Sequence, residues 1–190
     1  MKYSVGVYGD SISFGYGNND VSWFDLLSGF KNKLKLSQNG ETINNVLTKI
    51  SEDDNTYETL IIAVGVNNFL QISPVADDSQ MQNSMLMYEN ILKIALQKSD
   101  KVVLQNLLPV IENKFPNQKY LDAPKYVFNC NIVSFNKFLE RLSVKYGVML
   151  IDAYTFFNKK RLDEVYFDGV HPNEQGQILL LQIYQKELTL

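Results

Sequence analysis

Cysteine and histidine are nearly absent from this chain: 190 residues contain one of each, Cys130 and His171. A single cysteine excludes an internal disulfide and fits a reducing compartment. We expect Cys130 to be a small buried side chain rather than a reactive thiol, since no second histidine exists to activate it. The same scarcity leaves no cluster of metal ligands, so we expect neither a metal nor any other cofactor.

The chain also lacks a long apolar run and an excess of positive charge. No stretch approaches the ~20 apolar residues that a membrane span needs. The N-terminal apolar stretch is too short for a signal-peptide core. We therefore expect a cytoplasmic protein with no membrane span, although a secreted chain whose signal had been removed would look the same. The net charge is −3, so the basic clusters at 31–35 and 159–161 are interpreted as solvated faces rather than nucleic-acid sites.

What the sequence does contain is a regular alternation of strand and helix patterns. Four nearly continuous apolar runs predict parallel strands covered on both faces, and an alternating run at 33–38 predicts an edge strand. The four runs are Tyr3–Tyr8, Thr59–Val64, Lys101–Leu107 and Val148–Ile151. Helical periodicity occurs in 21–30, 42–50, 85–96 and 132–146, and again in a segment that begins at a plausible N-cap, Asn173.

Strands that alternate with helices indicate βαβ units with right-handed crossovers. We therefore expect one domain over residues 1–190 with an α/β fold, a three-layer α/β/α sandwich around a parallel, flavodoxin-like sheet of about five strands. The segment 109–129 is long for a connection and is a candidate lid or substrate loop.

In such a sheet, ligands bind beyond the carboxyl ends of the strands. Ser11 follows the first predicted strand, Gly40 follows the strand at 33–38, and Asn67 follows the strand that starts at Thr59. The three loops should therefore open at the same edge of the sheet.

Ser11 is either a turn residue or a nucleophile, and a nucleophilic serine needs a base, a group that orients the base and donors for the oxyanion. His171 is the only histidine available as base. Asp168 precedes it by three residues with Gly169 between them, a spacing that lets the carboxylate reach the near ring nitrogen. A His-Pro pair before a helix is also compatible with a simple helix entry.

The loops after the second and third of these strands could supply oxyanion donors. The side-chain amide of Asn67 could donate to a carbonyl oxygen held at Ser11, and the N–H of Gly40 could approach the same oxygen closely. Both segments, "QNGET" and "GVNN", also read as ordinary turns.

Together these segments resemble the SGNH (GDSL-type) hydrolase family over essentially the whole chain. "GDSI" resembles the first family block, Gly40 is a looser match to the second, "GVNN" resembles the third and "DGVHPN" the last. The resemblance implies a serine esterase with Ser11 as nucleophile, His171 as base and Asp168 orienting it. It also implies an oxyanion hole formed by the N–H groups of Ser11 and Gly40 and the side chain of Asn67.

The sequence departs from the family pattern at two places. Asn68 stands where the family often has aspartate, which affects loop support or substrate contact, and Ile12 replaces leucine in the first block. We interpret Asp10 as a structural residue that hydrogen-bonds the loop backbone.

The predicted activity is hydrolysis of small acyl esters, short-chain or O-acetyl, through an acyl-enzyme. The resemblance equally allows a thioesterase, a lysophospholipase or an acyltransferase at the same site. The alternative from a different functional class is a flavodoxin-like binding module whose 11–18 loop cradles a phosphate or flavin. This alternative leaves "DGVHPN" without a function. We expect a small-molecule ester as partner and no nucleic acid, and the sequence does not determine the oligomeric state.

Residues beside these loops are candidates for substrate contact, although each could equally belong to the core, and for Phe167 core packing is the stronger expectation. They are Phe14, Tyr16, Asn68, Phe69, Leu70, Tyr166 and Phe167.

Overall fold

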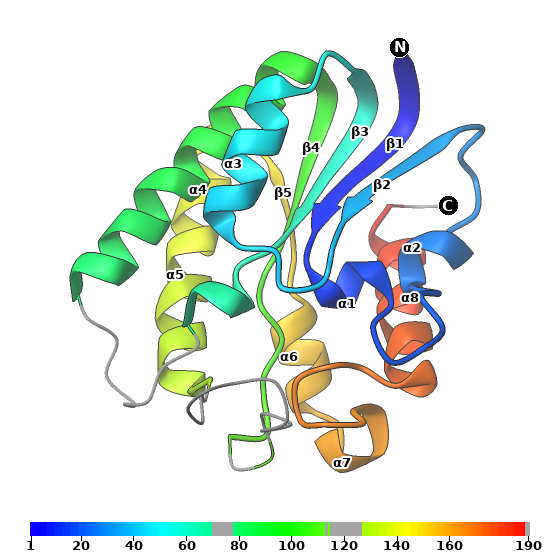
Figure 1. Ribbon diagram of the computed structural model, residues 1–190, viewed down its shortest axis with the longest axis vertical. Coiled ribbons are helices and arrows are strands. Elements are labelled where there is room, and N and C mark those ends of the chain that lie inside the picture. Colours follow the sequence, from blue (N-terminus) through cyan, green and yellow to red (C-terminus); the bar gives the residue numbers. More distant parts are fainter. Residues whose placement is uncertain (70–77, 113, 115–126, 189–190) are drawn as a thin grey trace.

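The computed structural model describes residues 1–69, 78–112, 114 and 127–188, and contains a five-stranded parallel sheet (Figure 1). The strand order is β2-β1-β3-β4-β5. The strands are β1 (Lys2–Gly9), β2 (Lys33–Ser37), β3 (Thr56–Ala63), β4 (Ser99–Gln105) and β5 (Met149–Ile151). All pairs are parallel, and β2 lies at an edge as its alternating sequence predicts.

Helices cover both faces of this sheet and make the three layers of an α/β/α sandwich (Figure 1). One face packs against α3 (Ile43–Glu52), α4 (Asp78–Lys98) and α5 (Asn129–Tyr146). The other packs against α2 (Trp23–Leu26), α6 (Ala153–Asn158), α7 (Leu162–Val165) and α8 (Glu174–Glu187). Two short elements, α1 (Ser11–Phe14) and η1 (Val66–Phe69), follow β1 and β3 directly. The predicted fold class is confirmed.

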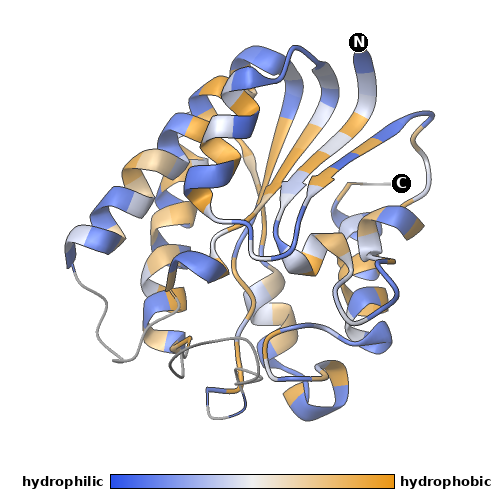
Figure 2. Cartoon of the chain, in the orientation of Figure 1, coloured by the Kyte–Doolittle hydropathy of each residue, from blue (hydrophilic) through white to orange (hydrophobic). Residues whose placement is uncertain are grey.

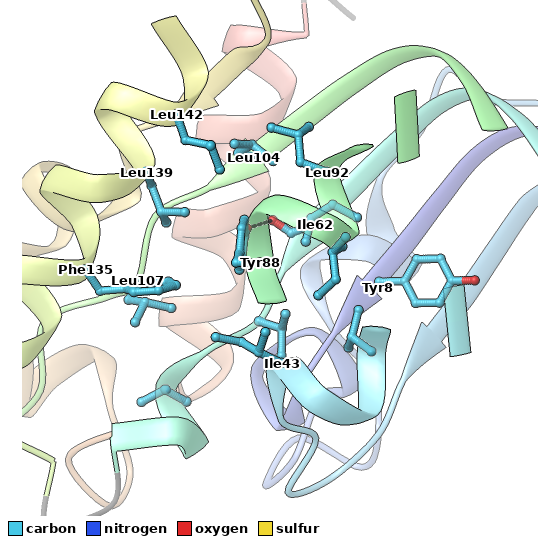
Figure 3. Packing of buried hydrophobic residues seen from close by; sticks show 14 of the residues in the cluster. Tyr8, Ile43, Ile62, Tyr88, Leu92, Leu104, Leu107, Phe135, Leu139 and Leu142 are labelled. Carbon is cyan, nitrogen blue, oxygen red and sulfur yellow. Dashed lines mark hydrogen bonds between the residues drawn. The ribbon is translucent and has the colours of Figure 1, made fainter. Parts of the chain in front are cut away.

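Successive residues of the strands divide between two apolar cores because side chains alternate across a strand. In β3, Leu60 and Ile62 belong to the core under α3–α5, whereas Ile61 and Ala63 belong to the core under α8. The sheet is accordingly apolar through its centre, while the outer faces of the helices are hydrophilic (Figure 2). Figure 3 shows Tyr88 of α4 reaching this sheet, where its hydroxyl donates to the Ile62 carbonyl at 3.3 Å.

Three expectations about local structure were wrong. The helix expected at 21–30 spans only Trp23–Leu26, because Leu27 takes an extended conformation and Gly29 has φ +88°. Cys130 is exposed rather than buried. Lys33 is not simply solvated: its Nζ donates to three backbone carbonyls at the end of α2, at 2.8 to 2.9 Å, and so ties α2 to the edge strand.

No helix in the described ranges has both the length and the apolar character that crossing a membrane requires.

Candidate active site

Ser11 lies in the first turn after β1, where the chain changes from strand to helix. Ser11 is 4% exposed and is the first residue of α1. Gly9, the last residue of β1, is opposite Ser37 of β2 and Ala63 of β3, so the three strands end at the same level. The loops that carry Ser11, Gly40 and Asn67 therefore leave one edge of the sheet side by side, as expected.

Asp10 shapes this turn. It is 2% exposed, and its Oδ1 accepts the N–H of Ile12 at 3.0 Å, which caps α1. Burial raises the pKa of the Asp10 carboxyl to about 6, against the lowering effect of the N–H groups of Ile12 and Gly65 and of His171 nearby. The interpretation of Asp10 as a structural residue is confirmed.

The loop before α8 brings His171 and Asp168 to Ser11. The Nε2 atom of His171 is 2.9 Å from Ser11 Oγ, and its Nδ1 atom is 2.6 Å from Asp168 Oδ2. Gly169, with φ +95°, makes the sharp turn between the acid and the base. These two contacts form a continuous chain from carboxylate through imidazole to hydroxyl, over a sequence separation of 160 residues between Ser11 and His171.

The Asp168 carboxylate is fixed by the backbone of its own loop. Its Oδ1 accepts the N–H groups of Val170 and His171, at 3.0 and 2.8 Å. Burial acts to raise the pKa of Asp168, but the hydrogen bonds and charge of His171 outweigh it and hold the pKa below its usual value. Asp168 is therefore ionised and able to orient an imidazole near neutral pH.

Glu41, the residue after Gly40, links the Gly40 loop to Asn67. Gly40 has φ +74°, and no atom of the described residues lies within 4 Å of the position that a Cβ would take. The side-chain amide of Asn67 donates to the Glu41 carbonyl at 2.9 Å, which fixes the Asn67 side chain against the loop after β2.

The Glu41 side chain was not singled out from the sequence. It is 2% exposed and forms an ion pair of 2.6 Å with Lys49 of α3. No sequence signal distinguishes it from an ordinary solvated glutamate before a helix. The Glu41–Lys49 pair therefore anchors, from inside the protein, the short loop that carries Gly40.

Two of the residues expected to contact substrate are instead core residues. Phe69 is fully buried and packs on Phe135, with ring centroids 5.1 Å apart. Tyr166 is 4% exposed, and its hydroxyl donates to the Pro109 carbonyl at 2.6 Å. The sequence left both substrate contact and core packing open for these two rings, and the structure places them in the two cores.

Of the remaining candidates for substrate contact that the structure describes, one supports a loop and the others lie at least partly at the surface. Asn68 supports the loop, since its Oδ1 accepts the N–H of Ile43 at the start of α3, at 2.8 Å. Phe14 is half-buried, with the Lys35 Nζ 5.5 Å from its ring centroid. Tyr16 is exposed. Leu70 and most of the candidate lid at 109–129 lie outside the described residues.

Phe167, expected in the core, is exposed at the site. It stacks on His171, with ring centroids 5.6 Å apart, and touches Tyr16, which itself packs on His171. The core expectation for Phe167 was wrong because the bridge between Tyr166 and Pro172 directs Tyr166 inward and its neighbour outward.

Comparison with known proteins gives a family. The GDSL-like lipase/acylhydrolase family matches residues 7–179. A search of the curated proteins found no match. The chain belongs to the GDSL-like lipase/acylhydrolase family, and it is accordingly an enzyme of the carboxylic ester hydrolase class.

Solved structures share the fold at low sequence identity. A lipolytic G-D-S-L family protein from Veillonella parvula is 18% identical with a TM-score of 0.75, covering 100% of this chain and 98% of its own. A GDSL-like lipase from Bacteroides thetaiotaomicron is 19% identical with a TM-score of 0.71, and the match covers 97% of this chain and 87% of that one. An acetylxylan esterase from Geobacillus stearothermophilus is 12% identical with a TM-score of 0.75, and the match covers 99% of this chain and 94% of that one.

Proposed function

We propose that the protein is a serine esterase that hydrolyses short-chain or O-acetyl esters through an acyl-enzyme, with Ser11, His171 and Asp168 as its catalytic residues. The observation that carries the proposal is the hydrogen-bonded series from Asp168 Oδ2 to His171 Nδ1, at 2.6 Å, and from His171 Nε2 to Ser11 Oγ, at 2.9 Å. These are the contacts that a serine nucleophile, its base and the orienting acid require.

In the first step, Ser11 Oγ attacks the ester carbonyl carbon while its proton passes to His171 Nε2. The oxygen–alkyl leaving group then takes that proton and departs as the alcohol, which leaves the acyl group on Ser11 Oγ. In the second step, water loses a proton to the same Nε2 and attacks the acyl carbon. Collapse of this intermediate releases the carboxylic acid and returns a proton to Ser11.

Asp168 keeps His171 in the tautomer that presents an unprotonated Nε2 to Ser11, and it stabilises the imidazolium as it forms. Its lowered pKa supports this role, because the carboxylate stays ionised wherever His171 acts as base. We assign the oxyanion donors to the N–H groups of Ser11 and Gly40 and to the Asn67 amide, whose three loops leave the sheet at one level.

The preference for short acyl groups is supported by the packing beside Ser11. Phe69 and Tyr166 fill the cores rather than lining a channel. The cavity bordered by Asp10, Ile12 and Val66 has a volume of about 10 Å³, room for about one water molecule. This cavity is therefore too small to hold an acyl chain.

The test is hydrolysis of p-nitrophenyl acetate by Ser11→Ala and His171→Ala, with Ser13→Ala as the matched control. Ser13 is equally buried, two residues away, and its hydroxyl has no hydrogen-bond partner among the described residues. We expect the first two variants to be inactive and Ser13→Ala to remain active. Turnover that survives Ser11→Ala in pure, folded protein would refute the proposal.

Two further measurements define the reaction. Asn67→Ala should lower kcat by roughly 10²–10³ if its amide is an oxyanion donor. A series of p-nitrophenyl esters of increasing acyl length should show kcat/KM falling steeply beyond butyryl; a maximum at long chains would favour a lysophospholipase instead. Adding an excess of alcohol or sugar acceptor and analysing the products would separate hydrolysis from acyl transfer.

A further inference from the structure

Two exposed aromatic rings lie against His171 at the mouth of the site. Tyr16 is 36% exposed and Phe167 47% exposed. Their ring centroids are 5.7 Å apart, and they are 4.7 and 5.6 Å from the imidazole centroid. Single exposed aromatic residues are ordinary on a protein surface, but rings that contact one another and a proposed catalytic base form an apolar patch of the kind that marks a binding site.

Backbone hydrogen bonds, rather than burial, hold this pair in place. The N–H of Tyr16 donates to the Ser11 carbonyl at 3.0 Å, and the N–H of Phe167 donates to the His171 carbonyl at 3.1 Å. Asn18 joins the two loops, because its Nδ2 donates to the Pro172 carbonyl at 2.8 Å. The rings therefore keep a fixed position relative to Ser11 and His171 while their faces stay open to solvent.

Gly17 is the residue that allows the rings to meet. It has φ +81°, and a Cβ at this position would come within 2.2 Å of the Phe167 ring. Any larger residue would displace Phe167 from the imidazole.

The position of the rings decides which part of an ester they contact. The proton held on His171 Nε2 is delivered to the oxygen of the leaving alcohol, so this oxygen must come within hydrogen-bonding distance of the imidazole. The carbonyl oxygen lies on the other side, toward the loops of Gly40 and Asn67. The groups that surround His171 therefore meet the alcohol part of the substrate and not its acyl part.

The surface beside the rings has mixed polarity. A groove of about 450 Å³ begins at Gly17. Its polar lining includes Asn18, Asn19 and Glu174, and its apolar lining includes Val21, Leu26 and Ile178. Amide and carboxylate groups bind hydroxyls, while a flat aromatic or aliphatic surface accommodates a face of C–H groups.

We propose that Tyr16 and Phe167 form the leaving-group subsite and that the alcohol they accept is a sugar ring. This inference rests on the proposed esterase function. A sugar presents an apolar face of C–H groups and a rim of hydroxyls, which matches a half-exposed aromatic ledge next to amide and carboxylate side chains. An alkyl chain would leave those polar groups without partners.

The experiment compares acetate esters that differ only in the alcohol: a mono-O-acetylated methyl glucoside, ethyl acetate, phenyl acetate and dodecyl acetate. The variants are Tyr16→Ala and Phe167→Ala, with Phe167→Trp as the conservative replacement. Leu86→Ala serves as the control, because Leu86 is a 59% exposed apolar residue of α4, away from the proposed subsite.

We expect each alanine variant to lower the ratio of kcat/KM for the sugar acetate to kcat/KM for ethyl acetate by about five- to tenfold, mainly through KM. Phe167→Trp should restore the ratio, and Leu86→Ala should leave it unchanged. An equal loss on every ester would overturn the proposal, because it would mean that the rings only support His171. A greater loss on phenyl or dodecyl acetate than on the sugar acetate would overturn the assignment of the sugar. Activity on ethyl acetate that persisted in Ser11→Ala would instead contradict the proposed function itself.

Discussion

The ion pair between Glu41 and Lys49 allows a prediction that links stability to the site. The Glu41 side chain is 2% exposed, and its Oε1 has no hydrogen-bond partner among the described residues. Lys49 is consequently the charged partner that compensates a buried carboxylate. Lys49→Met would remove this partner and leave the carboxylate beneath the loop that carries Gly40.

Removing one partner of a buried ion pair costs about 3–5 kcal/mol, because the remaining charge is left without compensation. The Lys49 side chain is 33% exposed, so water can replace part of the lost interaction. We therefore expect a decrease of about 3 kcal/mol in the free energy of unfolding, at the lower end of that range. The double variant Glu41→Gln/Lys49→Met retains neither charge and should recover most of this loss.

Urea unfolding of the two variants measures these differences. The matched control is Lys93→Met, which removes a half-exposed lysine 3.6 Å from Glu89 on α4, a surface pair worth about 0–1 kcal/mol. The same Lys49→Met protein should lose about tenfold or more in kcat, since small displacements of catalytic groups are costly and the Glu41 carbonyl fixes the Asn67 amide. If Lys49→Met destabilised the protein no more than Lys93→Met, the pair would not be a buried one in solution and this reasoning would fail.

Three further substitutions test the site. Asp168→Asn keeps an oxygen for the N–H groups of Val170 and His171 but favours the wrong imidazole tautomer, so kcat should fall by roughly 10³–10⁴ with little change in melting temperature. Asp10→Asn tests the raised pKa of Asp10. The protonated Asp10 carboxyl stabilises the fold fully below about pH 4, and this contribution is lost as the pH rises through about 6. Denaturant titrations should therefore show the free energy of unfolding of the wild type, relative to that of the variant, falling by about 3 kcal/mol from acid to neutral pH. Gly17→Ala should cost about 1–2 kcal/mol for its left-handed backbone, and should lower the sugar-to-ethyl acetate ratio by displacing Phe167.

Each of these has a result that contradicts it. A pH-independent difference between the wild type and Asp10→Asn would mean that the carboxyl is hydrated rather than buried. Near-normal turnover in Asp168→Asn would show that His171 is oriented by other groups. A Gly17→Ala protein with unchanged stability and selectivity would mean that the turn relaxes without moving the ring.

The sequence predicted the central sheet well because parallel strands buried on both faces are marked by continuous apolar runs. The one-turn α1 and η1, and the short α6 and α7, were not predicted, since helices of four to six residues carry almost no periodic signal. The contact of Ser11 with His171 was foreseeable because the chain has a single histidine, Asp168 precedes it by three residues, and both segments resemble blocks of one family.

The surroundings of the site were harder to predict. For Phe69 and Tyr166 the sequence left substrate contact and core packing equally open, and both rings are buried in the cores; Phe167 was expected in the core and is exposed. A β-like segment sends neighbouring side chains in opposite directions, and near Tyr166 the direction depends on a single bridge to Pro172 that no local pattern announces. The buried state of Glu41 likewise depends on a lysine in a helix that begins two residues later along the chain.

Gln177 connects α8, which is synthesised after all five strands of the sheet, to the turn that carries Ser11. Its side chain, in α8, accepts the N–H of Trp23 at 2.9 Å and donates to the Ile12 carbonyl at 3.0 Å, which joins α8 to the turn of Ser11. During synthesis, the sheet strands are all complete before His171 and α8 emerge. Ester hydrolysis therefore requires that the segment carrying His171 and α8 has docked onto the sheet, and it reports completion of this late-synthesised part of the fold.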